Sequence, residues 1–84
     1  MTASVPRLTV LARSYCHLCD DMIAALEQLR GRYRFDIEVV DVDRHPELEE
    51  KWGDKVPVLL DGGRELCHDF LDIDVVDARL ARMK

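Results

Sequence analysis

Long hydrophobic runs are missing from this sequence, and the longest apolar stretches span only a few residues. No segment is therefore long enough to cross a membrane. The start of the chain, Met1 to Pro6, also lacks the basic stretch and apolar run of a secretory signal peptide. The 12 lysines and arginines are scattered among 17 acidic residues, for a net charge of −5, so the positive stripe that nucleic acid requires is missing too. We expect no membrane and no nucleic acid among the partners.

Cysteine is also scarce. The chain has three, an odd number, whereas exported domains held by disulfides usually have an even set. We therefore expect a reducing, cytoplasmic location, where nearby cysteines are usually catalytic or metal-binding. The 84 residues leave room for one domain only, over residues 1–84, and we expect a monomer.

What the sequence does contain is an alternation of short strand and helix patterns. Apolar residues spaced by two predict strands, and spacings of three and four predict helices. The strands are predicted at 7–12, 35–42, 56–60 and 64–67, and the helices at 18–29, at 46–52 and from residue 69 onward. The first two strands should be parallel, and Asp61-Gly62-Gly63 predicts a hairpin between the last two. The result is an α/β fold of order β-α-β-α-β-β-α, with a four-stranded mixed sheet and helices on both faces.

Two helices carry specific predictions about burial and capping. In the first helix, apolar residues recur at helical spacing and are expected to form one face: Leu18, Met22, Leu26 and Leu29, with Ile23 and Ala25 alongside. Asp69 is expected to cap the last helix, with Asp72 as its reciprocal acid. The buried side of that helix is expected to consist of Leu71, Val75, Val76, Leu80 and Met83.

A pair of cysteines, Cys16 and Cys19, lies between the first predicted strand and the first predicted helix. Two intervening residues allow both sulfur atoms to lie in one helical turn, close enough to bond. The N-terminus of a helix offers unpaired N–H groups and a dipole that favour an anion. Because the thiolate is the reactive form of cysteine, this placement predicts that Cys16 attacks and Cys19 resolves.

Charged neighbours act on this pair in both directions. Arg13 and a protonated His17 would stabilise a thiolate at Cys16. Asp20 and Asp21 would oppose it, although acids in a first turn also stabilise the helix itself. The alternative interpretation is that both cysteines are small buried apolar residues. Their spacing at a strand-to-helix turn favours the redox interpretation.

One segment resembles the active-site segment of dithiol glutaredoxins: Arg13-Ser14-Tyr15-Cys16-His17-Leu18-Cys19. A second segment, Lys55-Val56-Pro57-Val58, resembles another signature of that family, a valine followed by a cis-proline at the start of the third strand. The resemblance covers nearly the whole chain and is strongest to short bacterial glutaredoxin-like proteins. It implies a thioredoxin-like, glutaredoxin-type fold with three α/β/α layers, in which Pro57 is cis and faces the cysteines. It also implies that the backbone of Val56 pairs with an incoming peptide or glutathione, and that the site is shaped by Arg13, Tyr15, His17 and Leu18.

The sequence departs from the glutaredoxin pattern at two places. His17-Leu18 stands between the cysteines, where these proteins usually carry Pro-Tyr or a similar pair. Leu66-Cys67-His68 stands where they carry the Gly-Gly pair beside the glutathione backbone. The bulkier side chains disfavour a seat for glutathione but leave the dithiol chemistry intact.

The third cysteine is expected near the pair for a topological reason. If the strand at 56–60 begins beside the cysteines, its antiparallel partner ends there, which brings Cys67, His68 and Asp69 to the same end of the sheet. A thiol within reach of Cys16 could exchange disulfides, accept glutathione or help to bind a metal. The alternative is a core cysteine at a strand end.

These observations favour a redox enzyme that reduces protein disulfides or glutathione mixed disulfides. Glutathione or a thioredoxin reductase-like protein is the expected electron donor, and neither a bound cofactor nor a metal is expected. Two alternatives stay open. A module for zinc, or for an iron–sulfur cluster shared by two chains, could use as ligands Cys16, Cys19, Cys67 and His68. The fold could also serve as a non-enzymatic interaction domain.

Overall fold

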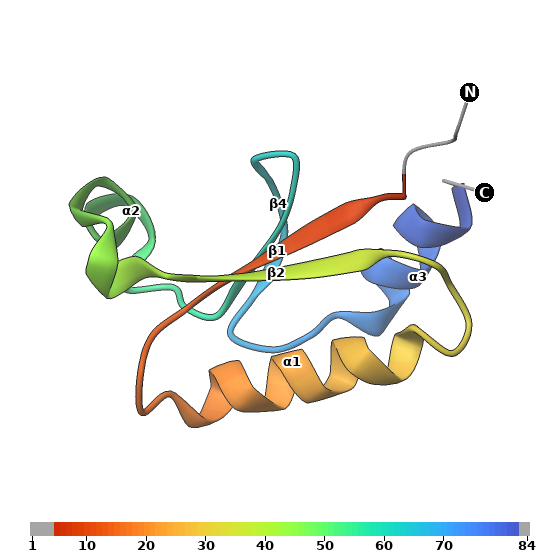
Figure 1. Ribbon diagram of the computed structural model, residues 1–84, viewed down its shortest axis with the longest axis horizontal. Coiled ribbons are helices and arrows are strands. Elements are labelled where there is room, and N and C mark those ends of the chain that lie inside the picture. Colours follow the sequence, from red (N-terminus) through yellow and green to blue (C-terminus); the bar gives the residue numbers. More distant parts are fainter. Residues whose placement is uncertain (1–4, 83–84) are drawn as a thin grey trace.

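The computed structural model describes residues 5–82, which form a four-stranded sheet with helices on both faces (Figure 1). In chain order the elements are β1 (Arg7–Ala12), α1 (His17–Leu29), β2 (Asp36–Asp41), a 3-10 turn η1 (Val42–Arg44), α2 (Pro46–Trp52), β3 (Val58–Asp61), β4 (Arg64–His68) and α3 (Ile73–Arg82). The strand order is β2-β1-β3-β4. β1 is parallel to β2 and antiparallel to β3, and β3 pairs antiparallel with β4. The predicted fold class and element order are therefore confirmed.

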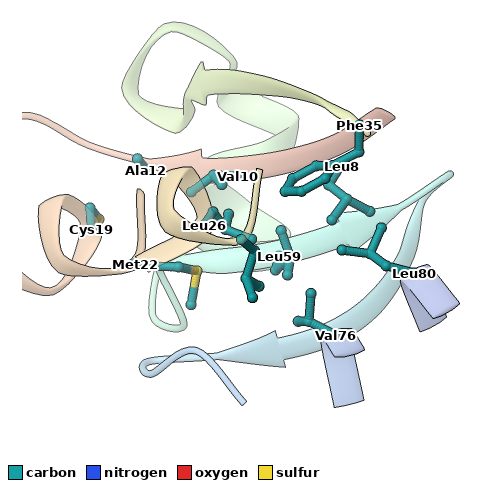
Figure 2. Close-up of a cluster of buried hydrophobic side chains, with 11 residues drawn as sticks. Leu8, Val10, Ala12, Cys19, Met22, Leu26, Phe35, Leu59, Val76 and Leu80 are labelled. Carbon is teal, nitrogen blue, oxygen red and sulfur yellow. The ribbon is translucent and has the colours of Figure 1, made fainter. Parts of the chain in front are cut away.

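The strand β1 contributes side chains to both faces of the sheet because successive residues of a strand point in opposite directions. Leu8, Val10 and Ala12 belong to a buried cluster with residues from α1 and α3 (Figure 2). Leu11 points to the other face, where Trp52 of α2 packs against a second cluster. The sheet is thus the middle of three layers, with α1 and α3 on one side and α2 on the other.

The hairpin between β3 and β4 turns at Gly62 and Gly63. Both glycines have positive φ angles, 60° and 88°, and an added Cβ would meet nothing within 4 Å at either. Glycine is therefore required here by the positive φ angles, at which residues with a Cβ are strained, and not by crowding from neighbouring atoms. The Asp61-Gly62-Gly63 signal correctly predicted this turn.

The buried face of α1 differs from the predicted apolar face at one position. Met22, Leu26 and Leu29 are buried, but Leu18 is 37% exposed. Cys19, three residues before Met22, takes the inward-facing position in the first turn and is 1% exposed. The apolar side of the helix therefore begins with the second cysteine, and Leu18 faces solvent beside it.

The cap of α3 is also a correction. The helix begins at Ile73, and Asp72 caps it, because its Oδ1 accepts the N–H of Val75 at 3.2 Å. Asp69 was predicted to be the cap, but it lies in the preceding turn with a φ of 66°. Its N–H donates to the carbonyl of Pro57 at 2.9 Å. This bond ties Asp69 to the residues before β3, so the helix starts later.

The apolar stripe of α3 is narrower than predicted. Val76 and Leu80, four residues apart, are buried, and Leu71 packs against the same cluster. Val75 was predicted to be buried but is 38% exposed, because it lies on the side of the helix next to this stripe. Met83 lies outside the described residues.

Candidate active site

Three chain segments meet at the end of the sheet where β1 finishes (Figure 1). Leu11 pairs with Val58, and Val58 pairs with His68, which aligns the end of β1 with the start of β3 and the end of β4. Just beyond them, the N–H of Asp69 reaches the carbonyl of Pro57. The loop after β1 carries the cysteine pair. The pair, the residues before β3 and the turn after β4 therefore lie at one end of the sheet.

Cys16 and Cys19 form a disulfide, with their Cα atoms 5.2 Å apart. Cys16 is the N-cap residue of α1, and its Sγ accepts the N–H of Cys19 at 3.1 Å. Cys19 is buried near Ala12 (Figure 2), whereas Cys16 is half-buried at the edge of the cluster. The pair starts the helix as predicted, and Cys16 is the more accessible of the two residues.

Tyr15, His17 and Leu18 are exposed side chains next to the pair. Tyr15 has a relative exposure of 107% and a φ of 58°, in the left-handed region that is costly for residues with a Cβ. Such conformations gather at binding and catalytic sites, where the surrounding structure holds them. The backbone before Cys16 thus presents an aromatic ring to solvent instead of packing it on the core.

The Val56–Pro57 peptide bond is cis, as the resemblance implied. Pro57 is buried, and Val56 is half-buried between the two clusters. Among the described residues, no backbone hydrogen bond involves the N–H or the carbonyl of Val56. Val56 precedes the first residue of β3, so its backbone polar groups lie outside the sheet ladder.

Arg13 has partners that the sequence did not indicate. Its guanidinium forms ion pairs with Glu49 of α2 and, at 3.6 Å, with Asp43. These two carboxylates offset the charge that was expected to stabilise a thiolate at Cys16. Arg13 therefore ties the loop before α1 to α2. No local sequence pattern could reveal the pairing with Glu49, because 36 residues separate the two.

Cys67 is half-buried opposite Leu59 in the β3–β4 ladder, against the cluster that α1 and α3 cover. Burial raises the pKa of its thiol above the ordinary value. A hydrogen bond from the backbone of Asp72 opposes the increase, and the carboxylates of Asp72 and Glu65 add to it. Cys67 is therefore protonated at neutral pH and is a poor nucleophile.

The structure does not bring together the four residues of the metal hypothesis. Cys67 lies opposite Leu59 and His68 opposite Val58, so their side chains point to opposite faces of the sheet. His68 Nδ1 lies 2.6 Å from Glu65 Oε2 instead. Within residues 5–82, no group of three or more His, Cys, Asp and Glu side chains is arranged to hold a metal ion. This geometry disfavours the four-ligand site.

A shallow hollow of about 200 Å³ lies beside Cys19, and sequence reasoning missed it. It opens between the start of α1 and the ends of β1 and β2, and its lining includes Asp20, Ile23 and Val39. The 51% exposure of Val39, an apolar residue of an edge strand, is the clearest sign of it. Strand alternation alone predicts where Val39 points but not whether a helix covers it.

Comparisons with known proteins agree with this geometry. A family model described as Glutaredoxin-like domain (DUF836) matches residues 7–81. An uncharacterized protein of Mycobacterium tuberculosis is 33% identical over 76 residues, which cover 84% of this chain and 76% of that protein. A solution structure of a Nitrosomonas europaea protein superimposes with a TM-score of 0.85 at 40% identity, over 95% of this chain and 96% of that one. Thioredoxin 1 of Thermosipho africanus shares the fold, with a TM-score of 0.61 at 22% identity, over 90% and 96% of the two chains.

The matched segment runs from β1 through most of α3, so it contains the cysteine pair, the cis-proline and the turn after β4. The superposition on thioredoxin confirms the thioredoxin-like fold that the motifs implied. A cysteine pair at disulfide distance within a family of this kind supports a thiol oxidoreductase-like role. The chain belongs to the glutaredoxin-like family.

Proposed function

We propose that this protein is a thiol–disulfide oxidoreductase that uses Cys16 to attack and Cys19 to resolve. The observation that carries the proposal is the bonded pair at the start of α1, with the N–H of Cys19 directed at Cys16 Sγ. In the reduced protein the same N–H would donate to a thiolate and stabilise it. Cys19 is buried, so an incoming disulfide meets Cys16 first.

The reaction then follows the exchange chemistry of thiols. The thiolate of Cys16 attacks one sulfur of the substrate disulfide and releases the other sulfur as a thiolate, which takes up a proton. Cys19, deprotonated, then attacks Cys16 Sγ in the mixed disulfide and releases the second substrate thiolate. Two electrons pass to the substrate, and the protein is left with the Cys16–Cys19 disulfide.

The backbone of Val56 supports a way to orient the substrate. Its N–H and carbonyl make no backbone hydrogen bond within the described residues, and the cis-proline after it lies at the same end of the sheet as the cysteines. A substrate segment in extended conformation could bond to both groups and add a short strand. This bonding would align the substrate sulfur with Cys16.

The internal disulfide must be reduced again for turnover. We propose glutathione or a thioredoxin reductase-like protein as the electron donor, with protein disulfides or glutathione mixed disulfides as substrates. Such a cycle needs a reducing compartment such as the cytosol. None of the helices within residues 5–82 is long and apolar enough to cross a membrane. We further propose that the protein works as a monomer without a bound cofactor or metal.

Alanine at Cys19 tests the order of the two steps. Without the resolving thiol, the first step should still occur and the mixed disulfide on Cys16 should accumulate to about one adduct per chain in the absence of other thiols. The reduced variant would be mixed with an excess of two short peptides joined by one disulfide, so that the released thiol diffuses away, and then quenched with acid and mapped by mass spectrometry. Cys67→Ala, which leaves the pair intact, is the matched control and should show no lasting adduct. An adduct located mainly on Cys67, or none at all, would contradict the proposal.

A further inference from the structure

Apolar side chains stand exposed around the cysteine pair on two sides. Tyr15 precedes the pair and Leu18 lies between its two cysteines at the start of α1, with exposures of 107% and 37%. Phe70, 69% exposed, follows Asp69 in the turn after β4, at the same end of the sheet. Exposed apolar side chains of this size can be buried against a polypeptide, whereas a small disulfide cannot cover all of them. The apolar surface is therefore larger than the area that glutathione, a tripeptide, would contact.

The charge of this surface is one-sided. The segments 13–21, 54–58 and 67–72, which meet at this end of the sheet, contain five acidic residues, all aspartates, and two basic residues, Arg13 and Lys55. Arg13 is paired with Glu49, and the Lys55 ammonium lies 5.6 Å from the centre of the Trp52 ring. No lysine or arginine within residues 5–82 forms an ion pair with any of the five aspartates: Asp20, Asp21, Asp54, Asp69 and Asp72.

This charge discriminates between substrate classes. Glutathione carries two carboxylates and one ammonium, so it is a net anion that needs cations at its binding site. Here it would meet, on both sides of Cys16, aspartates that no lysine or arginine neutralises, although His68 Nε2 lies 3.9 Å from Asp69 Oδ2. A polypeptide with lysine or arginine beside its disulfide would instead be attracted, and its apolar residues could cover Tyr15 and Phe70.

Building on the proposed function, we propose that this surface selects disulfides in protein segments that are basic and partly apolar, and disfavours glutathione-bearing substrates. The selection acts mainly on the association rate, because the aspartates lie around the pair and do not touch the reacting sulfurs. At low ionic strength a basic substrate should be reduced about tenfold faster than an acidic one of the same length, and about 0.5 M salt should remove most of the difference.

Three synthetic peptides test this selection. They share one internal disulfide and one length, and differ only in whether lysine, glutamine or glutamate flanks the cysteines. Each is mixed with the reduced protein, and the peptide dithiol is followed by chromatography after acid quench. Glutathione disulfide is the fourth substrate. We expect the rate order lysine, glutamine, glutamate, with glutathione disulfide slower than the glutamine peptide.

Two variants attribute the effect to the aspartates. Asp20→Asn with Asp69→Asn removes one charge from each side of the pair, and asparagine tolerates the positive φ of position 69. Asp36→Asn makes the same chemical change beside Arg7, at the far end of β1, and is the control. The double variant should lower the ratio of lysine to glutamate rates by about threefold, and the control should leave it unchanged.

The outcomes separate this inference from the function on which it rests. Equal rates for the lysine and glutamate peptides, or fastest reduction of glutathione disulfide, would overturn the charge selection while the oxidoreductase stands. The same holds if the control variant changes the ratio as much as the double variant does. Failure to reduce the neutral glutamine peptide would overturn the proposed function, and this inference with it.

Discussion

Replacing Cys16 by alanine is expected to abolish disulfide reduction, with a loss on the order of 10³-fold or more, because no other group takes the place of a missing nucleophile. Cys19 cannot substitute, since it is 1% exposed and packs inside the cluster. Cys67 cannot substitute either, because burial raises the pKa of its thiol. The measurement is the steady-state reduction of a peptide disulfide with a chemical dithiol as the donor.

The matched control for this experiment is Cys67→Ala, which makes the same substitution at the third cysteine and leaves the pair intact. We expect this variant to keep its rate within about twofold of the wild type. Unfolding is checked separately by circular dichroism, so that a misfolded variant is not read as an inactive one. Full activity of Cys16→Ala, or a loss in Cys67→Ala as large as that in Cys16→Ala, would contradict the account.

Replacing Leu59 by alanine is expected to have the largest effect on stability. Leu59 is fully buried and lies between Val10 of β1 and Cys67 of β4, at the centre of the cluster in Figure 2. Removing its branched end leaves a cavity and costs about 2.5–5 kcal/mol in the free energy of unfolding. A domain this small has roughly 5 kcal/mol in total, so the variant should keep at most about 2.5 kcal/mol, and its unfolded fraction should rise to between about 1% and 50% at room temperature.

Urea denaturation followed by Trp52 fluorescence measures this loss. Val39→Ala is the control, because it removes apolar atoms from β2 at a side chain that is 51% exposed. It should change the free energy of unfolding by less than about 0.5 kcal/mol. Leu59→Ala should move the midpoint down by at least about 1 M. Equal midpoints for the two variants would show that the cluster on the α1 side does not hold the domain together.

Most of the fold could be predicted because its signals are local. The strand pattern of residues 7–12 and the turn at Gly62 and Gly63 each depend on a few neighbouring residues, and both predictions are confirmed. The cap of α3 could not be chosen from sequence alone, since Asp69 and Asp72 both have the side chain for the role. A bond from Asp69 to Pro57, far away in the sequence, decides between them.

The candidate site likewise contains features that could be predicted from the sequence and features that could not. The position of Cys16 at the start of α1 follows from two adjacent elements and was predicted correctly. The pairing of Arg13 with Glu49 could not be predicted, because it depends on how α2 lies against the sheet. The opposite directions of Cys67 and His68 follow from strand alternation, yet the metal hypothesis overlooked this consequence.

The central claim, that Cys16 is the reactive thiol, is tested most directly by alkylation of the fully reduced protein at pH 7. A short exposure to iodoacetamide, followed by peptide mapping at several times, gives the rate at each cysteine. The account predicts that Cys16 reacts about tenfold faster than Cys67, since the helix start favours a thiolate at the first and burial disfavours one at the second. In urea the difference should disappear. Equal rates in the folded protein, or faster alkylation of Cys67, would contradict the account.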